Sequence, residues 1–409
     1  MSMLPFSVSH VNLALMVSSV SLFSLPVVAD DWPTLRGNGL SGISIESGLP
    51  DSGEVEVLWE AELGLGYSAP VISGGKVIVS GHDGEETDTL FCFDEQSGEV
   101  KWKHSYPQPI GDLYFQGGTT GTATIDGDQV FHLARQGELV CLSAGTGAVI
   151  WKKHLQSDFS YTPPTWGFGG SPLIQGDVVY LNAGEAGLAL NKSDGSVVWQ
   201  SEDEEAGYSG PYPFEMKGTR YLMFTNKRYY VCVDAETGDK VWEYKWMTRY
   251  GVNASDPVVA GDQIFISSGY GKGAVLLKWA GEGEPDRVWQ NRNMSTQMNA
   301  AVLIDGFLYG IDGGEGKEEA GLKCLEMASG DIKWLDTGIG HGSAVAVKDQ
   351  LVVLTEEGTL QIGKVSPAGF KATVSQKVLE PRVWTVPVFA NGRIYCRNAS
   401  GNFVVVKLK

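Results

Sequence analysis

Side chains suited to binding lie in short loops spread along the chain, each just ahead of an apolar, strand-like run. Aromatic walls with a few amides and charges suit a small polar ligand or an extended peptide. The alternative is that these residues only plug and hydrogen-bond the mouth of a channel. The candidates are Tyr67, Tyr161, Trp166, Phe168, Tyr208, Tyr212, Arg249, Tyr250, Asn253, Asp256, Gln297, Asn299, His341, Arg382 and Trp384.

Established catalytic and metal-binding motifs are absent from the sequence. It contains no HExxH, no CxxCH, no P-loop, no CxxC and no GxSxG. The nearest segment to the last, 207–210 (GYSG), lacks the final spacing and lies in a loop instead of a strand-to-helix elbow. His341 stands alone and is better explained as a channel residue than as a catalyst. We therefore predict no catalytic residue and no metal ligand.

The elements that must position these loops are repeated. A short turn followed by Trp recurs at Trp102, Trp151, Trp199, Trp242 and Trp334, each with Gly four residues earlier. Trp59 and Trp289 are further copies without that Gly. The intervals between the seven Trp are 43, 49, 48, 43, 47 and 45 residues. A period of this length over the whole chain indicates a repeat architecture.

Tight-turn pairs give a second, independent count. Apolar runs rich in Val, Ile and Tyr are broken by eight such pairs, several with the Asn-Gly or Asp-Gly chemistry of two-residue hairpins. The pairs are Gly74-Gly75, Asp126-Gly127, Gln175-Gly176, Lys217-Gly218, Ala260-Gly261, Asp305-Gly306, Lys348-Asp349 and Asn391-Gly392.

Each unit predicts a strand, hairpin, strand, loop, strand, Gly turn and Trp-bearing strand, which is a propeller blade. We predict an all-β, eight-bladed β-propeller of four-stranded antiparallel blades over 55–409. The eighth blade lacks its outer strand, and the strand around Trp59 can fill the gap and close the ring. The seventh unit, 342–377, lacks the Trp. No segment of the propeller predicts a helix.

The cysteines follow the repeat. Cys92, Cys141, Cys232 and Cys324 each lie ten residues before a repeat Trp. Equivalent positions in different blades are too far apart for a disulfide. We expect small buried residues on the third strand of each blade, and Cys396 in another strand.

Segments 233–242 (VDAETGDKVW) and 93–102 (FDEQSGEVKW) resemble the repeat of the PQQ-like (pyrrolo-quinoline quinone) propeller family. In that family the repeat Trp packs between neighbouring blades. The start of the arm, Asp31-Trp32-Pro33 with 36–39 (RGNG), resembles secreted planctomycete-type members. The eight-blade count resembles the propeller subunit of the outer-membrane β-barrel assembly machinery, although no lipidation Cys follows the leader.

The resemblance leaves two functions open. The first is an exported, non-catalytic binding or scaffold module of the periplasm or cell envelope, with no cofactor. Its partner would be an envelope protein, a peptide or a small polar ligand at the loop-rich channel face. The alternative is a PQQ- and calcium-dependent oxidoreductase acting on an alcohol or sugar. That enzyme would need an acidic and amide cluster around one calcium position, above a Trp floor in the channel.

The N-terminal segment and the charge bear on location. Residues 1–29 contain no charged side chain, and Val11–Leu25 is apolar but shorter than the ~20 residues of a spanning helix. Small residues at Val27–Ala29 predict a signal peptide over 1–29, with an uncleaved anchor as the alternative. We assign 30–54 to an N-terminal arm. The net charge of −18 argues against nucleic acid and anionic membrane surfaces as partners, and we expect no membrane insertion and a monomer.

Overall fold

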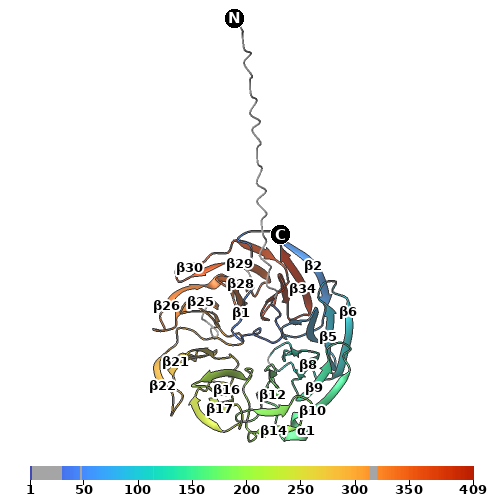
Figure 1. The fold of residues 1–409 in the computed structure, drawn as a ribbon, viewed down its shortest axis with the longest axis vertical. Helices are drawn as coiled ribbons and strands as arrows, with labels where there is room; N and C mark the ends of the chain where they lie inside the picture. The colour runs from blue at the N-terminus through green and yellow to red at the C-terminus, as the bar shows by residue number, and fades with distance from the viewer. Residues whose placement is uncertain (2–29, 47, 114, 314–319) are drawn as a thin grey trace.

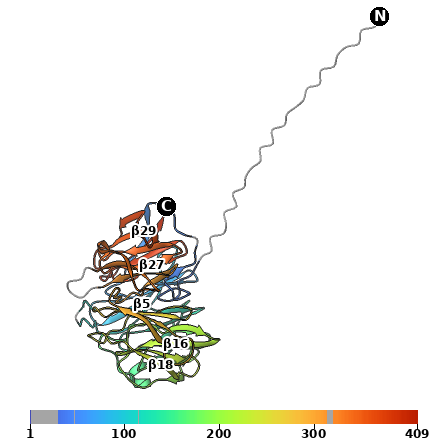
Figure 2. The same cartoon turned by 90° about the vertical axis from the view of Figure 1, so that its left-hand side faces the viewer.

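Eight antiparallel sheets stand in a ring around a central axis (Figure 1). The computed structural model describes residues 1, 30–46, 48–113, 115–313 and 320–409. This arrangement confirms the predicted eight-bladed β-propeller. Seen from the side, β27 (Ser343–Val347) and β29 (Thr359–Ser366) of one blade lie across the ring from β16 (Thr219–Thr225) and β18 (Lys240–Lys245) of another (Figure 2). The predicted signal peptide falls in 1–29 and so lies outside the described residues, apart from Met1.

We number the blades in chain order and give their strands from the innermost to the outermost. Blade 1 contains β3 (Val71–Ser73), β4 (Lys76–His82), β5 (Thr87–Asp94) and β6 (Val100–Pro107). Blade 2 contains β7 (Thr124–Asp126), β8 (Gln129–Leu133), β9 (Glu138–Ser143) and β10 (Val149–His154). Blade 3 contains β11 (Leu173–Gln175), β12 (Val178–Leu181), β13 (Leu188–Asn191) and β14 (Val197–Gln200). Blade 4 contains β15 (Tyr212–Met216), β16 (Thr219–Thr225), β17 (Tyr229–Asp234) and β18 (Lys240–Lys245).

The second half of the ring continues this order. Blade 5 contains β19 (Val258–Ala260), β20 (Gln263–Ser268), β21 (Gly273–Lys278) and β22 (Asp286–Asn291). Blade 6 contains β23 (Val302–Ile304), β24 (Phe307–Asp312), β25 (Gly321–Glu326) and β26 (Ile332–Asp336). Blade 7 contains β27 (Ser343–Val347), β28 (Gln350–Leu354), β29 (Thr359–Ser366) and β31 (Val374–Lys377), with the short β30 (Gly369–Phe370) also paired to β29. Blade 8 contains β32 (Val388–Ala390), β33 (Arg393–Arg397), β34 (Asn402–Leu408) and β2 (Val55–Glu62).

The ring closes through β2, as predicted. This strand runs antiparallel to β34, from Val55 opposite Leu408 to Glu62 opposite Asn402, and the two lie side by side near the C-terminus (Figure 1). The start of the propeller therefore supplies the outermost strand of its last blade, and the ring has no open end.

A two-residue turn joins the first two strands of every blade. Five of the predicted pairs occupy the turn itself, as at Asn391-Gly392, where both residues have positive φ. In blades 2, 3 and 5 the turn lies one residue later than predicted, at Gly127-Asp128, Gly176-Asp177 and Gly261-Asp262. There the glycine, with φ near +60°, takes the first central position, as hairpin turns of this kind require.

The repeat Trp of one blade packs against the Gly turn of the next blade. The indole Nε1–H of Trp102 donates to the carbonyl of Ala144, 3.0 Å away. A Cβ added to Gly147 would lie 2.7 Å from the Trp102 ring, and Gly147 has a φ of +71°, so this turn needs glycine twice over. The same bond to the next blade joins Trp59 to Glu95, Trp151 to Lys192, Trp199 to Ala235, Trp289 to Met327 and Trp334 to Ser366.

Blade 7 has no repeat Trp, and among the junctions that do have one, a single junction departs from this rule. Among the described residues, Trp242 Nε1 has no hydrogen-bond partner. Blade 5 presents Trp279 in place of a Gly turn, with the two ring centroids 5.8 Å apart at an interplanar angle of 63°. Trp279 Nε1 donates instead to Gly283, within its own loop. This replacement explains why Trp289 has no Gly four residues before it.

Each repeat cysteine faces its Trp across the ladder between the third and fourth strands. Cys92 pairs with Trp102, and Cys141, Cys232 and Cys324 pair with Trp151, Trp242 and Trp334. All five cysteines are free and buried, Cys396 on β33 included. Burial raises the pKa of the Cys92 thiol to about 11, so it remains a compact apolar side chain.

Two short helices contradict the prediction that no segment of the propeller is helical. α1 (Leu155–Phe159) follows β10, and the 3-10 helix η1 (Thr337–Ile339) follows β26. Leu155 and Phe159 are buried, so α1 fills space beside blades 2 and 3. Within the described ranges no helix is long and apolar enough to cross a membrane.

The N-terminal arm crosses the ring on the side of the two-residue turns. Trp32 is fully buried and forms a β-bridge with Ile72 of blade 1. The short β1 (Ile43–Ser44) then adds a parallel strand to β27, inside the innermost strand of blade 7. Beyond it, both Glu46 carboxylate oxygens accept backbone N–H bonds from the turn of blade 8 at Asn391 and Gly392. The Thr34 hydroxyl of the arm shares a hydrogen bond with Thr124 of blade 2, and Arg36 donates to the Ala300 carbonyl just ahead of blade 6, so the arm connects blades on opposite sides of the channel.

Candidate functional site

A cavity of about 370 Å³ lies where the loops entering the innermost strands converge. Every blade except the seventh contributes such a loop, so the wall is assembled from segments far apart in the sequence. Seven of the candidates predicted from the sequence line the cavity: Tyr67, Trp166, Tyr208, Asp256, Gln297, Asn299 and Trp384.

Aromatic rings form most of the wall. Tyr67 and Trp384 are stacked, with centroids 5.5 Å apart and an interplanar angle of 23°. Phe115 lies 5.8 Å from Tyr67 on one side. Across the cavity, Trp166 and Tyr208 meet edge to face at 5.9 Å. Paired rings of this kind hold one another rigid and present flat apolar surfaces to a ligand.

Asp256 is the one charged side chain in the cavity lining. Its Oδ1 accepts the backbone N–H of Gly210 at 2.9 Å. Burial raises the pKa of Asp256, and the positive charge of Arg36 and the Gly210 N–H partly oppose that rise. The cavity therefore combines an apolar wall with one carboxylate.

Two amides complete the polar part of the lining. Asn299 Nδ2 donates to the carbonyl of Trp384 at 3.2 Å, and Gln297 Nε2 donates to the Tyr270 hydroxyl at 3.0 Å. Each amide thus uses one of its two N–H donors within the protein. Their side-chain oxygens and the carboxylate of Asp256 are the amide and carboxylate acceptors of the lining.

The arm forms the floor of the cavity. Leu35 lines the cavity, and the neighbouring Arg36 is half-buried. Arg36 donates to four carbonyls, those of Leu40, Ser41, Ala300 and Ala301, at 2.8–3.1 Å. The arm is fixed there by these bonds, and a ligand must enter from the loop face.

Three candidates lie outside the cavity because they are buried between blades. Tyr161 is 1% exposed, and its hydroxyl donates to the carbonyl of Ser201 at 2.7 Å. Asn253 is fully buried and donates to the carbonyls of Asn226 and Trp246. Both have the alternative role considered above, which is to satisfy buried polar groups between loops. Phe168 is likewise buried, in the same cluster as Tyr161.

The remaining candidates lie at or beyond the rim. Arg382 is exposed, with its guanidinium 4.7 Å from the ring of Trp384. Tyr250 is 46% exposed and meets the cavity residue Tyr270 edge to face at 5.0 Å, and Arg249 stacks on Tyr250. Tyr212 is half-buried in the blade 4–5 core. The His341 backbone N–H donates to Glu356 in blade 7, and His341 does not line the cavity.

Sequence reasoning missed Leu35, Phe115, Tyr270 and Met298, which also line the cavity. Leu35 belongs to the arm, and nothing in the local pattern shows that the arm crosses the channel. Tyr270 lies between the second and third strands of its blade, a class of loop that the prediction did not consider. That class opens on the same face as the loops entering the innermost strands, so this topological rule would have found Tyr270.

The cavity does not fit PQQ and calcium. PQQ carries three carboxylates, yet the lining contains no Lys, Arg or His and has one carboxylate of its own. Its floor is Leu35 and the arm, where the oxidoreductase alternative requires a Trp. In the described part of the chain no three His, Cys, Asp or Glu side chains are grouped to hold a metal ion. No step of PQQ chemistry follows from these residues.

A second group of titratable side chains is buried between blades 1 and 2. The Tyr106 hydroxyl lies 2.8 Å from His132 Nε2 and 3.4 Å from Asp88 Oδ2. Burial raises the pKa of Asp88 to about 6, against the opposing charges of His82 and Arg135. Burial also lowers the pKa of His132 to about 4. This seam therefore contains a carboxyl whose charge changes close to neutral pH.

Comparisons with known proteins agree with the repeat. The chain is 24% identical over 355 residues to the outer membrane protein assembly factor BamB of Yersinia pestis, covering 82% of this chain and 85% of that protein. Among solved structures, BamB from Moraxella catarrhalis aligns over 87% of this chain and 100% of its own, with 16% identity and a TM-score of 0.63. A europium-containing methanol dehydrogenase aligns over 93% and 98%, with 11% identity and a TM-score of 0.66. At such identities the two structures show the shared fold alone.

The family assignment rests on the central blades. Residues 86–336 match the model of the PQQ_2 family, described as "Outer membrane protein assembly factor BamB". This match covers more than half of the chain, and the protein therefore belongs to that family.

Proposed function

We propose that this chain is an exported, non-catalytic propeller that acts as a binding and scaffold module in the cell envelope. Its relatives are named assembly factors of the outer membrane, which supports a role in holding other proteins together. The central cavity is the site where we place a protein or peptide partner. Export depends on the predicted signal peptide over 1–29.

The observation that carries this proposal is the composition of the cavity. Rigid aromatic pairs such as Tyr67 with Trp384 supply contact area, and the acceptors at Asp256, Gln297 and Asn299 can fix a donor group. Nothing in the lining provides a nucleophile with an adjacent base. A cavity closed below by the arm can receive a side chain or a chain end, which suits recognition better than turnover.

Site-specific photocrosslinking in cells tests the proposal. A photoreactive residue at Leu113, at the cavity, should crosslink to an envelope protein, while the same residue at Val198 on the outer strand β14 should not. The additional change Trp384→Ala should reduce the Leu113 crosslink by about tenfold, because an aromatic anchor of the cavity wall is lost. Equal crosslinking from both positions would contradict the proposal.

Titration with PQQ and Ca²⁺ and a dye-linked oxidation assay address the enzyme alternative. We expect neither saturable binding nor turnover of an alcohol or sugar. Turnover that disappears in Asp256→Asn would replace the scaffold proposal with an oxidoreductase.

A further inference from the structure

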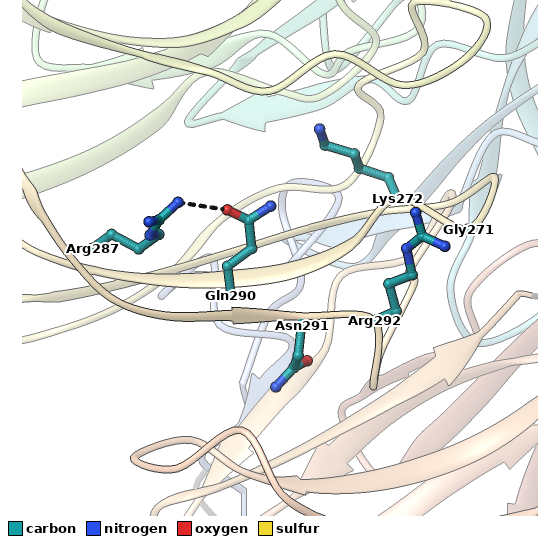
Figure 3. A pocket seen from close by; sticks show the side chains of 6 residues that line it. All are labelled: Gly271, Lys272, Arg287, Gln290, Asn291 and Arg292. Atoms are coloured by element: carbon teal, nitrogen blue, oxygen red, sulfur yellow. Dashed lines mark hydrogen bonds between the residues drawn. The ribbon is translucent and has the colours of Figure 1, made fainter.

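A groove of about 550 Å³ lies between β22, the outermost strand of blade 5, and the loop that joins β20 to β21 (Figure 3). It is lined by Gly271, Lys272, Arg287, Gln290, Asn291 and Arg292. Lys272 and Arg292 lie at one end, and Arg287, whose guanidinium donates to Gln290 Oε1 at 3.2 Å, lies at the other (Figure 3). The lining thus holds three cations and no carboxylate, in a protein of net charge −18.

None of the three cations forms an ion pair within the described ranges. Other outermost strands pair their lysines with carboxylates: Lys101 with Asp94, Lys240 with Glu243 and Lys333 with Glu326. Lysines on edge strands are a common defence against aggregation, and a pair with a neighbouring carboxylate fits that role. The unpaired set on blade 5 needs a different explanation.

Lys272 lies against an aromatic ring. Its Nζ lies 4.5 Å from the ring centroid of Trp246, which is itself buried. Burial, and then the charge of Arg292, lower the pKa of Lys272. Two cations near one another without a carboxylate repel, and an anion bound between them would remove that cost.

The groove suits an extended ligand. Arg287 lies on β22 and Arg292 directly follows it, so at ~3.3 Å per residue they span roughly 16 Å. A single phosphate bridges a much shorter distance. β22 is the outermost strand of its sheet, so one edge of its backbone is unpaired, and Val288 beside it is 49% exposed. A strand of a partner could add to such an edge.

We propose that this groove binds an acidic, extended peptide segment of a partner protein along the free edge of β22. Its carboxylates would meet Lys272 and Arg292 at one end and Arg287 at the other. The site is separate from the central cavity: within one loop, Tyr270 lines the cavity and Lys272 lines the groove. The proposal does not depend on what the cavity binds.

Fluorescence anisotropy with a labelled peptide of about ten residues, alternating Glu and Thr, tests the groove in the full mature chain. We expect Lys272→Gln/Arg292→Gln to weaken binding by about tenfold at low salt, because two charge contacts are removed. The matched control, Lys101→Gln/Lys103→Gln on β6 of blade 1, should change it by less than about twofold. Hydrogen exchange should slow in 286–292 when the peptide is bound, and not in 332–336 of β26.

Four outcomes would overturn the proposal: no binding by the native chain, equal binding by the groove variant, no protection of 286–292, or displacement by inorganic phosphate at matched ionic strength. The last would show a site for small anions. Phosphatidylglycerol vesicles form a further arm, and recruitment that is lost in the groove variant would assign the groove to a membrane surface instead. Trp384→Ala should bind the acidic peptide normally, which separates failure here from failure at the cavity.

Discussion

The junctions between blades use the same contacts repeatedly, whereas the centre of the ring is lined by residues that do not repeat. At the junctions one arrangement is used repeatedly, with an indole N–H bonded to the next blade and a glycine beneath the ring, as at Trp102 and Gly147. At the centre nothing repeats, and the wall joins Tyr67, Asp256 and Trp384 from three blades over a floor made by the arm. The comparison teaches that the repeat provides the ring, while the loops and the arm provide the site.

The junction glycine offers the largest expected effect. Gly147→Ala forces a side chain into positive φ and against the Trp102 ring, and should lower the free energy of unfolding by roughly 3–5 kcal/mol. Gly127→Ala, also at positive φ but with open space around its Cβ, should cost only ~1–2 kcal/mol. Urea unfolding followed by tryptophan fluorescence measures both. Equal losses would show that backbone strain, and not the contact with Trp102, makes glycine necessary.

Asp88, buried between blades 1 and 2, should make the free energy of unfolding depend on pH. Its folded pKa of about 6 lies above the ordinary value of 3.8, so the folded state holds the proton more tightly than the unfolded state. Protonated Asp88 therefore adds to the free energy of unfolding. This contribution, up to ~3 kcal/mol, is complete below pH ~4 and is lost as the pH rises through 6.

Asp88→Asn should therefore flatten the fall in stability between pH 4 and pH 8. The gain relative to the native chain should be greatest at pH 8 and absent near pH 4. Thermal unfolding across that range measures it, and parallel pH profiles for the two proteins would contradict the assignment. Asp94→Asn, at an exposed turn, is the matched control for removing a charge, since the pKa of Asp94 is lowered.

The regular and irregular junctions should differ by one hydrogen bond. Trp102→Phe removes both ring area and the bond to Ala144, whereas Trp242→Phe removes ring area alone because its Nε1 has no acceptor. We expect the first change to cost ~1 kcal/mol more than the second. Urea midpoints compare them, and a larger loss at Trp242 would mean that its contact with Trp279 outweighs the hydrogen bond.

The smallest expected effect is the labelling of the cysteines, which should not react in the folded protein. All five are buried, and burial raises the pKa of Cys92 and Cys324 to about 11. A maleimide reagent should label no cysteine at pH 7 and all five in urea, counted by mass spectrometry. Rapid labelling of the folded protein would show that a blade opens at its third strand.

Much of the ring could be predicted because its signals are local. A Gly turn, a Cys and a Trp at fixed spacing lie within one blade, and the hairpin pairs repeat the same chemistry eight times. The Gly that precedes other repeat Trp residues by four positions is missing before Trp289. There, Trp279 packs against Trp242 in place of a Gly turn. The site was predicted less completely, since a loop position does not show whether a side chain points inward, as Trp384 does, or between blades, as Tyr161 does.

The sequence by itself determined the eight-bladed ring and its closure by the strand of Trp59, because periodic packing needs only the repeat. Only the tertiary structure decided that the arm closes the channel below Asp256, and that Lys272, Arg287 and Arg292 line one groove without a counter-charge. The physical reason is the distance in sequence over which each interaction acts. Turn and strand preferences act over a few residues, whereas a cavity floor and an unpaired cluster of charges depend on which distant segments the closed ring brings together.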